Sequence, residues 1–386
     1  MTLYRFDQIA ENIRVPVMPK PEDSERYIGL EHMDTDSLRI RRWGADTTLI
    51  GQKLAMKKGD VLFAKRNAYI RRVAVAPFDG LFSAHGMVLR AKTDVCLHDF
   101  LPVFMQSDYF MERAIKISVG SLSPTINWSS LNREEFEIPS LDEQRRISDL
   151  LWAADDVIQK WETAKQSALQ LLESTLFENF SSELIPGSKQ NWEIVPLNQV
   201  AHLQTGIAKG KSYGKEIETV ELPYLSVLNV QDGYIDLTGI KTIVIPKKEV
   251  GKYLLQSNDI VIAEGGDSDK VGRGAIWHGE IDICLHQNHI FCIRTNKEKL
   301  LSEFLSFQMR SRYGKAYFLK GAKKTSNLAS INSTQVKQFP VLLCSLDIQN
   351  KIVSQITQLE NAVNQIYEHL SVSVNLKKSL LAQFLS

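Results

Sequence analysis

One short basic segment of the sequence, Lys65–Arg72, combines the side chains that proteins use to bind nucleic acid. It reads KRNAYIRR and holds four cations, an amide and a phenol. Arginine and asparagine can pair with the edges of guanine and adenine through two hydrogen bonds, whereas lysine and tyrosine suit phosphate oxygens. The segment follows the apolar run Val61–Phe63, so we expect a loop at the end of a strand. Taken alone, it is equally compatible with a solvated charged loop.

A second polar segment occupies the corresponding place later in the chain. Residues 267–273, DSDKVGR, follow the apolar run 260–262 in the same way. Each half also has a polar segment before its last predicted strand, at 121–127 and 323–327, and the second half adds a Lys-Gly-Lys loop at 209–211. Loops on a rigid scaffold commonly carry binding residues. The candidate DNA-binding residues are Lys65, Arg66, Asn67, Tyr69, Arg71, Arg72, His85, Ser123, Thr125, Lys209, Lys211, Lys270, Arg273, His289, Lys323, Lys324 and Ser326.

Motifs of nucleotide-binding proteins, zinc proteases and DNA methyltransferases are missing from the sequence. The stretch nearest to a nucleotide-binding P-loop, Gly266–Arg273, has one residue too many and no Lys-Ser/Thr pair after the glycine. The H-E-x-x-H motif of zinc proteases does not occur. A DNA methyltransferase would need an Asn/Asp-Pro-Pro-aromatic motif, and the chain contains no Pro-Pro pair. We therefore expect a protein that binds but does not catalyse.

Four residues of the second half, Cys284, His286, His289 and Cys292, are of the types that bind zinc. Their spacing differs from that of zinc fingers, and the first half has only His85 at the corresponding place. Strand residues packed in a sheet explain the same pattern. We therefore expect no metal.

Length and composition indicate a soluble protein large enough for two or three domains. Of its 386 residues, 44% are hydrophobic and 24% are charged, which is ordinary for globular proteins. A formal charge of +1 means that nucleic acid must be bound by local basic patches. The N-terminus does not resemble a signal peptide, no apolar run is long enough to cross a membrane, and the four cysteines form no C-x-x-C pair. These features predict a cytoplasmic protein with reduced thiols and no membrane partner.

An internal repeat spans nearly the whole chain. Residues 6–10, FDQIA, correspond to LNQVA at 197–201, and GDVLFAK at 59–65 corresponds to NDIVIAE at 258–264. Single residues correspond in the pairs His85 and His289, Arg90 and Arg294, Ser107 and Ser311, and Tyr109 and Tyr313. Each copy therefore consists of a globular part followed by one long apolar-periodic segment.

The periodic segments 140–180 and 346–385 are predicted to form two long helices. Apolar residues recur in both at alternating steps of three and four, which is typical of a helical packing seam. Ser140 and Glu143 have the form of a capping box at the start of the first helix. A helix of about 40 residues is roughly 60 Å long, far longer than usual in a globular domain, and needs a partner. The expected seam residues are Ile147, Leu151, Ile158, Trp161, Leu172, Ile352, Leu359 and Ile366.

Both globular parts mix short strands with helices, and they lack the regular alternation of a doubly wound sheet, so the fold class is α+β. Apolar runs between turn-forming residues mark the strands. The expected strands are 61–63, 73–75 and 87–89 in the first copy and 243–245, 260–262 and 289–293 in the second. The expected helices are 99–116 and 300–319.

The stretch Gly120–Ile158 resembles the end of a target-recognition domain and the start of the central conserved helix in type I restriction-modification specificity subunits. Its most specific part is the Ile-Pro-x-Leu-x-Glu-Gln sequence. The repeat and the WEIVPL sequence at 192–197 are similar too, so the resemblance covers essentially the whole chain. Ser140 stands where the family often has a second proline, and Ile348 replaces the glutamate before Gln349.

The resemblance implies an α+β fold with two pseudo-repeated target-recognition domains, joined by two long antiparallel coiled-coil helices. The recognition domains would be 1–139 and 183–345, and the helical regions 140–182 and 346–386. Antiparallel helices would place the two domains so that both face one DNA duplex, as the two heads of a dimer do.

The implied function is that of a non-catalytic subunit that binds a bipartite site in double-stranded DNA. The helices would separate the recognition domains and dock methyltransferase subunits, and a restriction subunit would join for cleavage. No cofactor would bind this chain; S-adenosylmethionine, ATP and Mg²⁺ are expected on the partners. Because the loops of the two copies differ, the half-sites are expected to differ.

Three other interpretations remain open at this point. The chain could be the specificity subunit of a type IIG-like system, a non-enzymatic coiled-coil adaptor whose basic loops are surface charge, or an independent enzyme without a familiar motif. DNA binding that is specific in sequence and steep in salt would exclude the adaptor.

Overall fold

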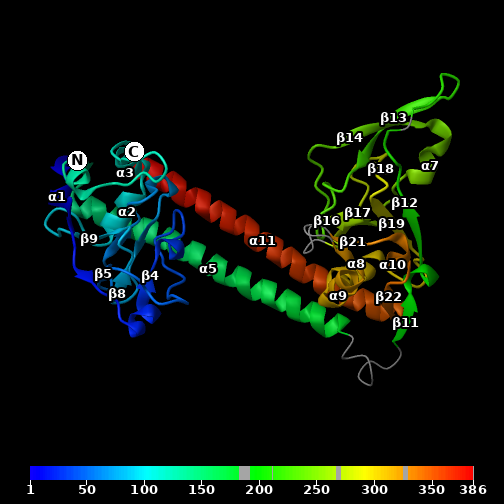
Figure 1. Ribbon diagram of the computed structural model, residues 1–386, viewed down its shortest axis with the longest axis horizontal. Coiled ribbons are helices and arrows are strands. Elements are labelled where there is room, and N and C mark those ends of the chain that lie inside the picture. Colours follow the sequence, from blue (N-terminus) through cyan, green and yellow to red (C-terminus); the bar gives the residue numbers. More distant parts are fainter. Residues whose placement is uncertain (182–191, 211, 267–270, 325–328, 386) are drawn as a thin grey trace. The chain divides into compact units, whose positions relative to one another are not determined.

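The chain forms two compact units that each contain one globular part and a section of both long helices. Unit 1 consists of Met1–Ala164 and Ile366–Ser386, and unit 2 of Lys165–Gln365 (Figure 1). The computed structural model describes residues 1–181, 192–210, 212–266, 271–324 and 329–385. Among these residues, no helix is long and apolar enough to cross a membrane.

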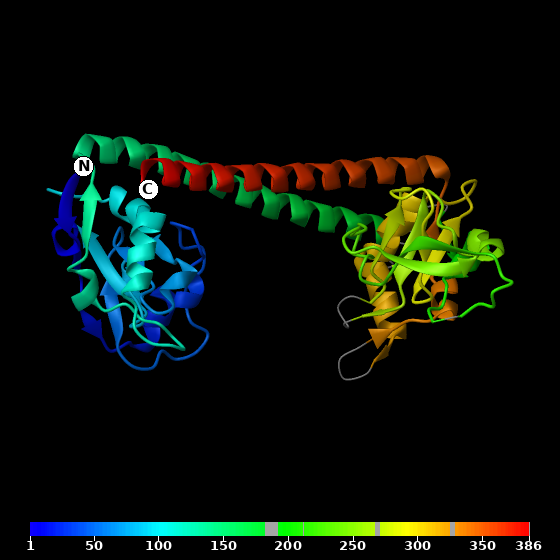
Figure 2. The ribbon, with the colours of Figure 1, turned by 90° about the horizontal axis from the view of Figure 1, so that it is seen from above.

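Two helices of the predicted length follow the globular parts: α5 (Leu141–Phe180) and α11 (Leu346–Phe384). Unit 1 contains residues 141–164 of α5 and 366–384 of α11, and within it these sections run antiparallel, because Asp155 contacts Lys377 and Trp161 contacts His369 (Figure 2). In this unit the ring of Trp161 stacks on that of His369, with the centroids 4.7 Å apart and the planes 9° apart. The predicted pairing of the helices is therefore present.

Fewer apolar residues of α5 are buried than the repeating apolar pattern in the sequence predicts. Ile147 and Leu151 are buried, whereas Leu150, Val157 and Leu171 are 42%, 43% and 54% exposed. The alternating spacing also fits these exposed positions, so periodicity alone cannot tell which side of a wide stripe packs inward. Of the expected seam residues, Ile147, Leu151 and Ile352 are buried, and Ile158, Trp161, Leu172, Leu359 and Ile366 are partly buried.

Unit 1 packs its sheets and short helices against the helix pair. Its sheets have the orders β2-β9-β6-β7, β3-β5-β8-β4 and β1-β10. The strands are β1 (Thr2–Arg5), β2 (Ala10–Asn12), β3 (Pro16–Val17), β4 (Tyr27–Ile28), β5 (Lys53–Met56), β6 (Val61–Phe63), β7 (Val73–Val75), β8 (Gly80–Phe82), β9 (Met87–Ala91) and β10 (Glu135–Ile138). The short helices are α1 (Phe6–Ile9), α2 (Phe100–Gln106), α3 (Asp108–Lys116) and α4 (Trp128–Leu131), with 3-10 turns η1 (Pro21–Arg26), η2 (Leu30–His32) and η3 (Ala68–Ile70).

One core joins this globular part to the helices. Phe6, Phe63, Phe110 and Phe136 are completely buried in the same cluster as Ile147 of α5. Burying each such side chain contributes about 1.5–3 kcal/mol. The first turns of α5 thus belong to the core of the globular part of unit 1.

Unit 2 repeats this plan. Its sheets have the orders β12-β19-β15-β17, β14-β13-β18, β16-β21-β20 and β11-β22. The strands are β11 (Glu193–Pro196), β12 (Ala201–Thr205), β13 (Thr219–Leu225), β14 (Lys241–Pro246), β15 (Asp259–Ala263), β16 (Gly265–Gly266), β17 (Gly274–Trp277), β18 (Leu285–His286), β19 (Ile290–Thr295), β20 (Lys323–Lys324), β21 (Ala329–Ser330) and β22 (Pro340–Leu343). The short helices are α7 (Val250–Tyr253), α8 (Ser302–Arg310), α9 (Arg312–Gly321) and α10 (Ser333–Lys337), with 3-10 turns η5 (Leu197–Gln199) and η6 (Lys247–Glu249).

The helices expected at 99–116 and 300–319 are each broken in two. The breaks fall at Ser107 and Ser311, which the repeat aligns. Ser107 Oγ accepts a hydrogen bond from Phe110 N, and Ser311 Oγ from Gly314 N. Each serine therefore caps a second helix, α3 or α9, in the way serine commonly does. The expectation of one continuous helix was wrong because apolar spacing masked the cap.

A buried ion pair recurs at the start of the corresponding central strands β6 and β15. Asp60 and Asp259 are 3% and 1% exposed. Arg90 Nε lies 2.9 Å from Asp60 Oδ1, and Arg294 Nε lies 2.8 Å from Asp259 Oδ1. Removing either arginine would leave a buried carboxylate without its counter-charge, which is strongly destabilising. These arginines are structural, and the four-stranded sheet is repeated in this contact as well as in its strand order.

Candidate nucleic-acid interface

In unit 1, the basic loop after β6 lies against the polar segment that precedes α4. Lys65 O accepts a hydrogen bond from Ile126 N at 3.0 Å, and Asn67 N donates one to Pro124 O at 2.8 Å. Asn67 adopts a left-handed conformation with φ 55°, which asparagine tolerates better than most residues. The two predicted segments therefore form one continuous surface.

Arg66 lies at the centre of this surface. It forms an isolated antiparallel bridge with Thr125, and its Nη2 donates to Ser123 Oγ at 3.2 Å. Arg66 N also donates to the backbone oxygen of His85 at 3.4 Å. Four residues that the sequence predicted separately are thus brought together, and the side chains of Arg66 and His85 are exposed.

Other side chains around Arg66 have the character expected of a DNA contact. Tyr69 is 57% exposed. Burial and the nearby charge of Arg14 lower the pKa of Lys65, and an approaching phosphate would relieve that repulsion. Arg14 and Leu122, which is 96% exposed on the adjoining segment, were missed by the sequence reasoning. Arg14 follows β2, which lies beside β9 in the sheet. This position is the one signal that could have indicated that Arg14 lies near Lys65.

Arg71 and Arg72 turn into the domain instead. Arg71 Nη1 lies 2.6 Å from Asp108 Oδ1, and its Nη2 donates to Gln106 O at 2.8 Å. Arg72 Nη1 donates to Leu30 O at 2.8 Å, and burial lowers the pKa of this arginine. Both guanidinium groups therefore hold the loop in place through contacts with other parts of unit 1.

In unit 2, the corresponding segments form the small sheet β16-β21-β20. Gly265 and Lys323 both pair with Ser330, and Ile331 N donates to Glu264 O at 2.8 Å. This last bond matches the one between Ile126 and Lys65 in unit 1. The side chain of Lys323 is exposed. Both units thus place a loop after a central strand against a polar segment before a short helix.

The side chains on the two surfaces differ. Glu264 stands at the position that Lys65 has in unit 1, and its Oε2 lies 2.6 Å from Nδ1 of His289. The side chain of His289 is 54% exposed. Glu264 was absent from the candidates, although the alignment of the two copies pointed to it. A carboxylate in unit 2 therefore replaces the lysine ammonium of unit 1, whereas both surfaces contain a histidine, His85 or His289.

The side chains of two other candidates in unit 2 have different partners. Arg273 Nη2 donates to Val227 O at 3.1 Å, so it supports a neighbouring loop. Lys209 Nζ lies 5.0 Å from the ring centre of Tyr224. Lys211, Lys270 and Ser326 fall outside the described residues, and Lys324 is placed only as part of β20.

The Cys/His cluster does not form a metal site. His286 is completely buried, its Nδ1 lies 3.0 Å from Tyr253 O, and burial lowers its pKa to about 4. Burial also raises the pKa of Cys284 to about 12. Within the described part of the chain, no three Cys, His, Asp or Glu residues are placed to hold a metal ion. His286 and Cys292 are buried in strands β18 and β19, Cys284 is buried just before β18, and His289 lies on the exposed turn before β19.

The pentapeptide at 210–214, GKSYG, matches the G-x-S-x-G motif of serine hydrolases. A nucleophile of that kind lies on a turn from a strand into a helix. Here the segment connects two strands, β12 and β13, without a helix in the described residues between them. It therefore lacks the setting that would activate the serine.

Comparison with known proteins agrees with this architecture. The model of the type I restriction modification DNA specificity domain matches residues 43–171 and again 189–376. The StySPI specificity subunit of Salmonella potsdam is 23% identical over 86% of this chain and 73% of its own length. The EcoKI specificity subunit of Escherichia coli K12 is 23% identical over 80% of this chain and 68% of its own length. A putative MjaX specificity subunit of Methanocaldococcus jannaschii is 25% identical, but this chain spans only 48% of it.

Solved structures show the same fold. The S subunit of a type I restriction-modification system from M. genitalium superimposes with a TM-score of 0.62 at 14% identity, covering 100% of this chain and 96% of that one. A chain from a study of assembly and conformational transition of the type I system gives a TM-score of 0.58 at 16% identity, covering 100% and 97%.

A repeated α+β domain followed by a long helix is thus the fold that this chain shares with the solved S subunit. The chain belongs to the family of type I restriction-modification DNA specificity subunits. As a member of that family it is a recognition component and not a catalytic one.

Proposed function

We propose that this chain binds a bipartite DNA sequence, with unit 1 reading one half-site and unit 2 the other. The observation that carries the proposal is the recurrence of one loop arrangement with different side chains. Lys65 and Glu264 occupy the same position beside equivalent backbone hydrogen bonds, from Ile126 and Ile331. A scaffold that is kept while a partly exposed side chain on it changes is suited to reading two different sequences.

The chemistry of each surface indicates what it would contact. The guanidinium group of Arg66 can pair with O6 and N7 of guanine, and the carboxylate of Glu264 can accept a hydrogen bond from N4 of cytosine. Lys65, Tyr69 and Lys323 suit phosphate oxygens, which fix the position of the protein on the duplex. Arg71, Arg72 and Arg273 would not contact DNA but would hold these loops in place.

Membership of the family supports a proposal about assembly. We propose that the chain docks methyltransferase subunits and a restriction subunit, and that S-adenosylmethionine, ATP and Mg²⁺ are bound by those partners. The recognition domains would be 1–139 and 183–345 and the helical regions 140–182 and 346–386. A DNA target accords with the cytoplasmic location expected from the sequence.

Selection from random duplexes tests this function. The chain, purified in complex with its methyltransferase subunits, should enrich DNA with two short fixed sequences separated by a fixed number of variable base pairs. Binding to the enriched duplex should weaken steeply with salt, because phosphate contacts release counterions. Enrichment of a single continuous sequence, or of none, would contradict the proposal.

A further inference from the structure

A buried ion pair connects the two long helices inside unit 1. Asp155 of α5 and Lys377 of α11 are each 4% exposed, and Lys377 Nζ lies 2.8 Å from Asp155 Oδ1. Taking two charges out of water costs several kcal/mol each, and their attraction only roughly offsets that cost. A leucine pair would fill the same seam without the cost. Stability is therefore a poor explanation for these residues.

Arg39 binds the same carboxylate from the globular part. Its Nε lies 2.7 Å from Asp155 Oδ2, and its guanidinium lies 5.5 Å from the ring centre of Trp152. Arg39 forms a parallel bridge with Val75 of strand β7. One carboxylate thus joins three elements: helix α5, helix α11 and the edge of the central sheet.

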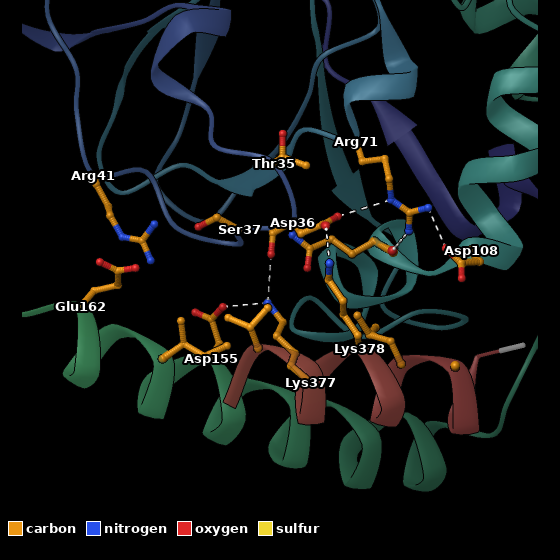
Figure 3. A pocket seen from close by; sticks show the side chains of 15 residues that line it. Thr35, Asp36, Ser37, Arg41, Arg71, Asp108, Asp155, Glu162, Lys377 and Lys378 are labelled. Carbon is orange, nitrogen blue, oxygen red and sulfur yellow. Dashed lines mark hydrogen bonds and ion pairs between the residues drawn. The ribbon is translucent and has the colours of Figure 1, made fainter. Parts of the chain in front are cut away.

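Asp36 connects this ion pair to the recognition loop, because it contacts lysines of α11 and an arginine of the loop. Its backbone oxygen lies 3.4 Å from Lys377 Nζ, and its Oδ2 lies 3.5 Å from Lys378 Nζ. Its Oδ1 lies 3.4 Å from Nε of Arg71, which ends the loop that carries Arg66. Figure 3 shows these side chains converging around a cavity of about 500 Å³ between the globular part and the helices of unit 1.

The backbone at both ends of this last contact is held in an uncommon conformation. Asp36 and Arg71 have φ angles of 56° and 59°. For residues other than glycine, asparagine or aspartate this conformation is rare and costs of order 1 kcal/mol or more. Aspartate tolerates this conformation, but arginine does not, so Arg71 is held by its surrounding contacts and not by local preference.

Unit 2 has only part of this arrangement. Glu360 follows Gln349 at the spacing at which Asp155 follows Gln144, and Arg310 Nη2 lies 3.0 Å from Glu360 Oε1. The repeat places Leu172 where unit 1 has Lys377. Both units therefore bind an acidic residue of a helix with an arginine of the globular part, but the described contacts of unit 2 contain no lysine from the second helix at this position.

We propose that Asp155, Lys377, Arg39 and Asp36 together fix the orientation of the unit 1 recognition loop on the helix pair, and thereby limit the chain to one spacing between half-sites. The inference rests on the proposed function. Buried ionic groups are retained for specificity in several proteins, even where apolar replacements are as stable. These residues are positioning residues, since they act on DNA through the loop that ends at Arg71.

Two apolar variants test the proposal. Lys377→Met leaves Asp155 paired with Arg39, so no buried charge loses its partner. Asp155→Leu combined with Lys377→Met removes the pair entirely. Asp156→Asn is the matched control, because Asp156 binds the same Arg39 but its side chain is 57% exposed. Each full-length variant is expressed with its methyltransferase subunits in cells, and methylated adenines are mapped across the genome.

Both apolar variants should fold, with a melting temperature at or above that of the unchanged chain, and should keep the bases of both half-sites. Methylation at sites whose spacer is one base pair longer or shorter should rise by about tenfold, which corresponds to about 1.4 kcal/mol of lost discrimination. The control should keep one spacer. An unchanged spacer between half-sites in Lys377→Met would overturn the proposal. Loss of folding in that variant would overturn it too, because the pair of Asp155 and Lys377 would then serve stability. If the unchanged chain itself gives no bipartite motif, the proposed function fails and not only this inference.

Discussion

Gln144 and Gln349 make the same three hydrogen bonds at the starts of the two long helices, and both are completely buried. Gln144 Oε1 accepts from Leu97 N at 2.8 Å, and its Nε2 donates to Val95 O and Pro139 O. The side chain of Gln349 does the same with Leu301 N, Lys299 O and Cys344 O. Each amide therefore fastens the first turn of a helix to the loop before α2 or α8 of its own unit.

Replacement of these glutamines should destabilise the two units separately. Gln144→Leu leaves three buried backbone groups without partners, at a cost of about 1 kcal/mol or more for each. Amide hydrogen exchange should therefore accelerate in β9, β6 and α2 of unit 1 by about a hundredfold, while the strands of unit 2 change little. Gln349→Leu is the matched variant and should show the reverse pattern. Equal acceleration in both units would mean that the amides do not act locally.

Arg66→Ala should relax the specificity of the first half-site at one base pair. Loss of a bidentate contact to guanine costs about 1–3 kcal/mol of discrimination, and the second half-site should be unaffected. Arg66→Lys separates base contact from phosphate contact, because lysine keeps the charge but not the planar pair of donors. Selection of bound duplexes by both variants provides the measurement. Uniformly weaker binding to all sequences in Arg66→Ala, rescued by Arg66→Lys, would assign Arg66 to a phosphate.

Glu264→Gln should change the second half-site and leave the first intact. The substitution keeps the shape of the side chain but replaces one acceptor oxygen with a donor, so a cytosine contact would be lost or exchanged. Lys65→Gln, at the same position of unit 1, is the matched variant and should weaken binding without changing bases if Lys65 contacts phosphate. Methylation mapping of both variants reports the outcome. An unaltered second half-site in Glu264→Gln would place base reading elsewhere in unit 2.

Acidification should loosen unit 2 through His286. Its pKa is about 4 in the folded chain, against about 6.5 for an ordinary histidine. Above pH 6.5 both folded and unfolded chains leave it neutral, and its full contribution is present. As the pH falls from 6.5 to 4, the unfolded chain binds a proton that the folded chain excludes, and about 3 kcal/mol is lost.

His286→Asn should reduce that pH dependence, because asparagine can still donate to Tyr253 O but does not titrate. Amide exchange in β13 and β18, compared at pH 7 and pH 5, measures the effect. His202→Asn replaces an exposed histidine of the same unit and should leave the pH dependence as it is. A pH response in His286→Asn as large as in the unchanged chain would exclude this histidine as its source.

The sequence predicted the repeat, the long helices and most central strands, because each rests on a pattern of apolar residues that local geometry dictates. Val61–Phe63 and Ile260–Ile262 are the middle of their sheets, and the burial of central strands leaves a clear apolar run. The breaks at Ser107 and Ser311 were missed, because a single capping serine does not interrupt helical spacing.

The candidate site was predicted in part. Arg66, Ser123, Thr125 and His85 were named separately and meet in one place. Charge alone could not show that Arg71 binds Asp108 or that Arg72 binds Leu30 O, since those contacts depend on tertiary packing. For the same reason the sequences of the two helices could not predict that Asp155 pairs with Lys377.

A map of methylated adenines in cells that express this chain with the methyltransferase subunits proposed as its partners tests the central claim most directly. The account predicts a motif of two different short sequences separated by a fixed number of unspecified base pairs, and a motif that disappears when this chain is omitted. A single continuous motif, or one that persists without the chain, would contradict its role as the DNA-reading subunit.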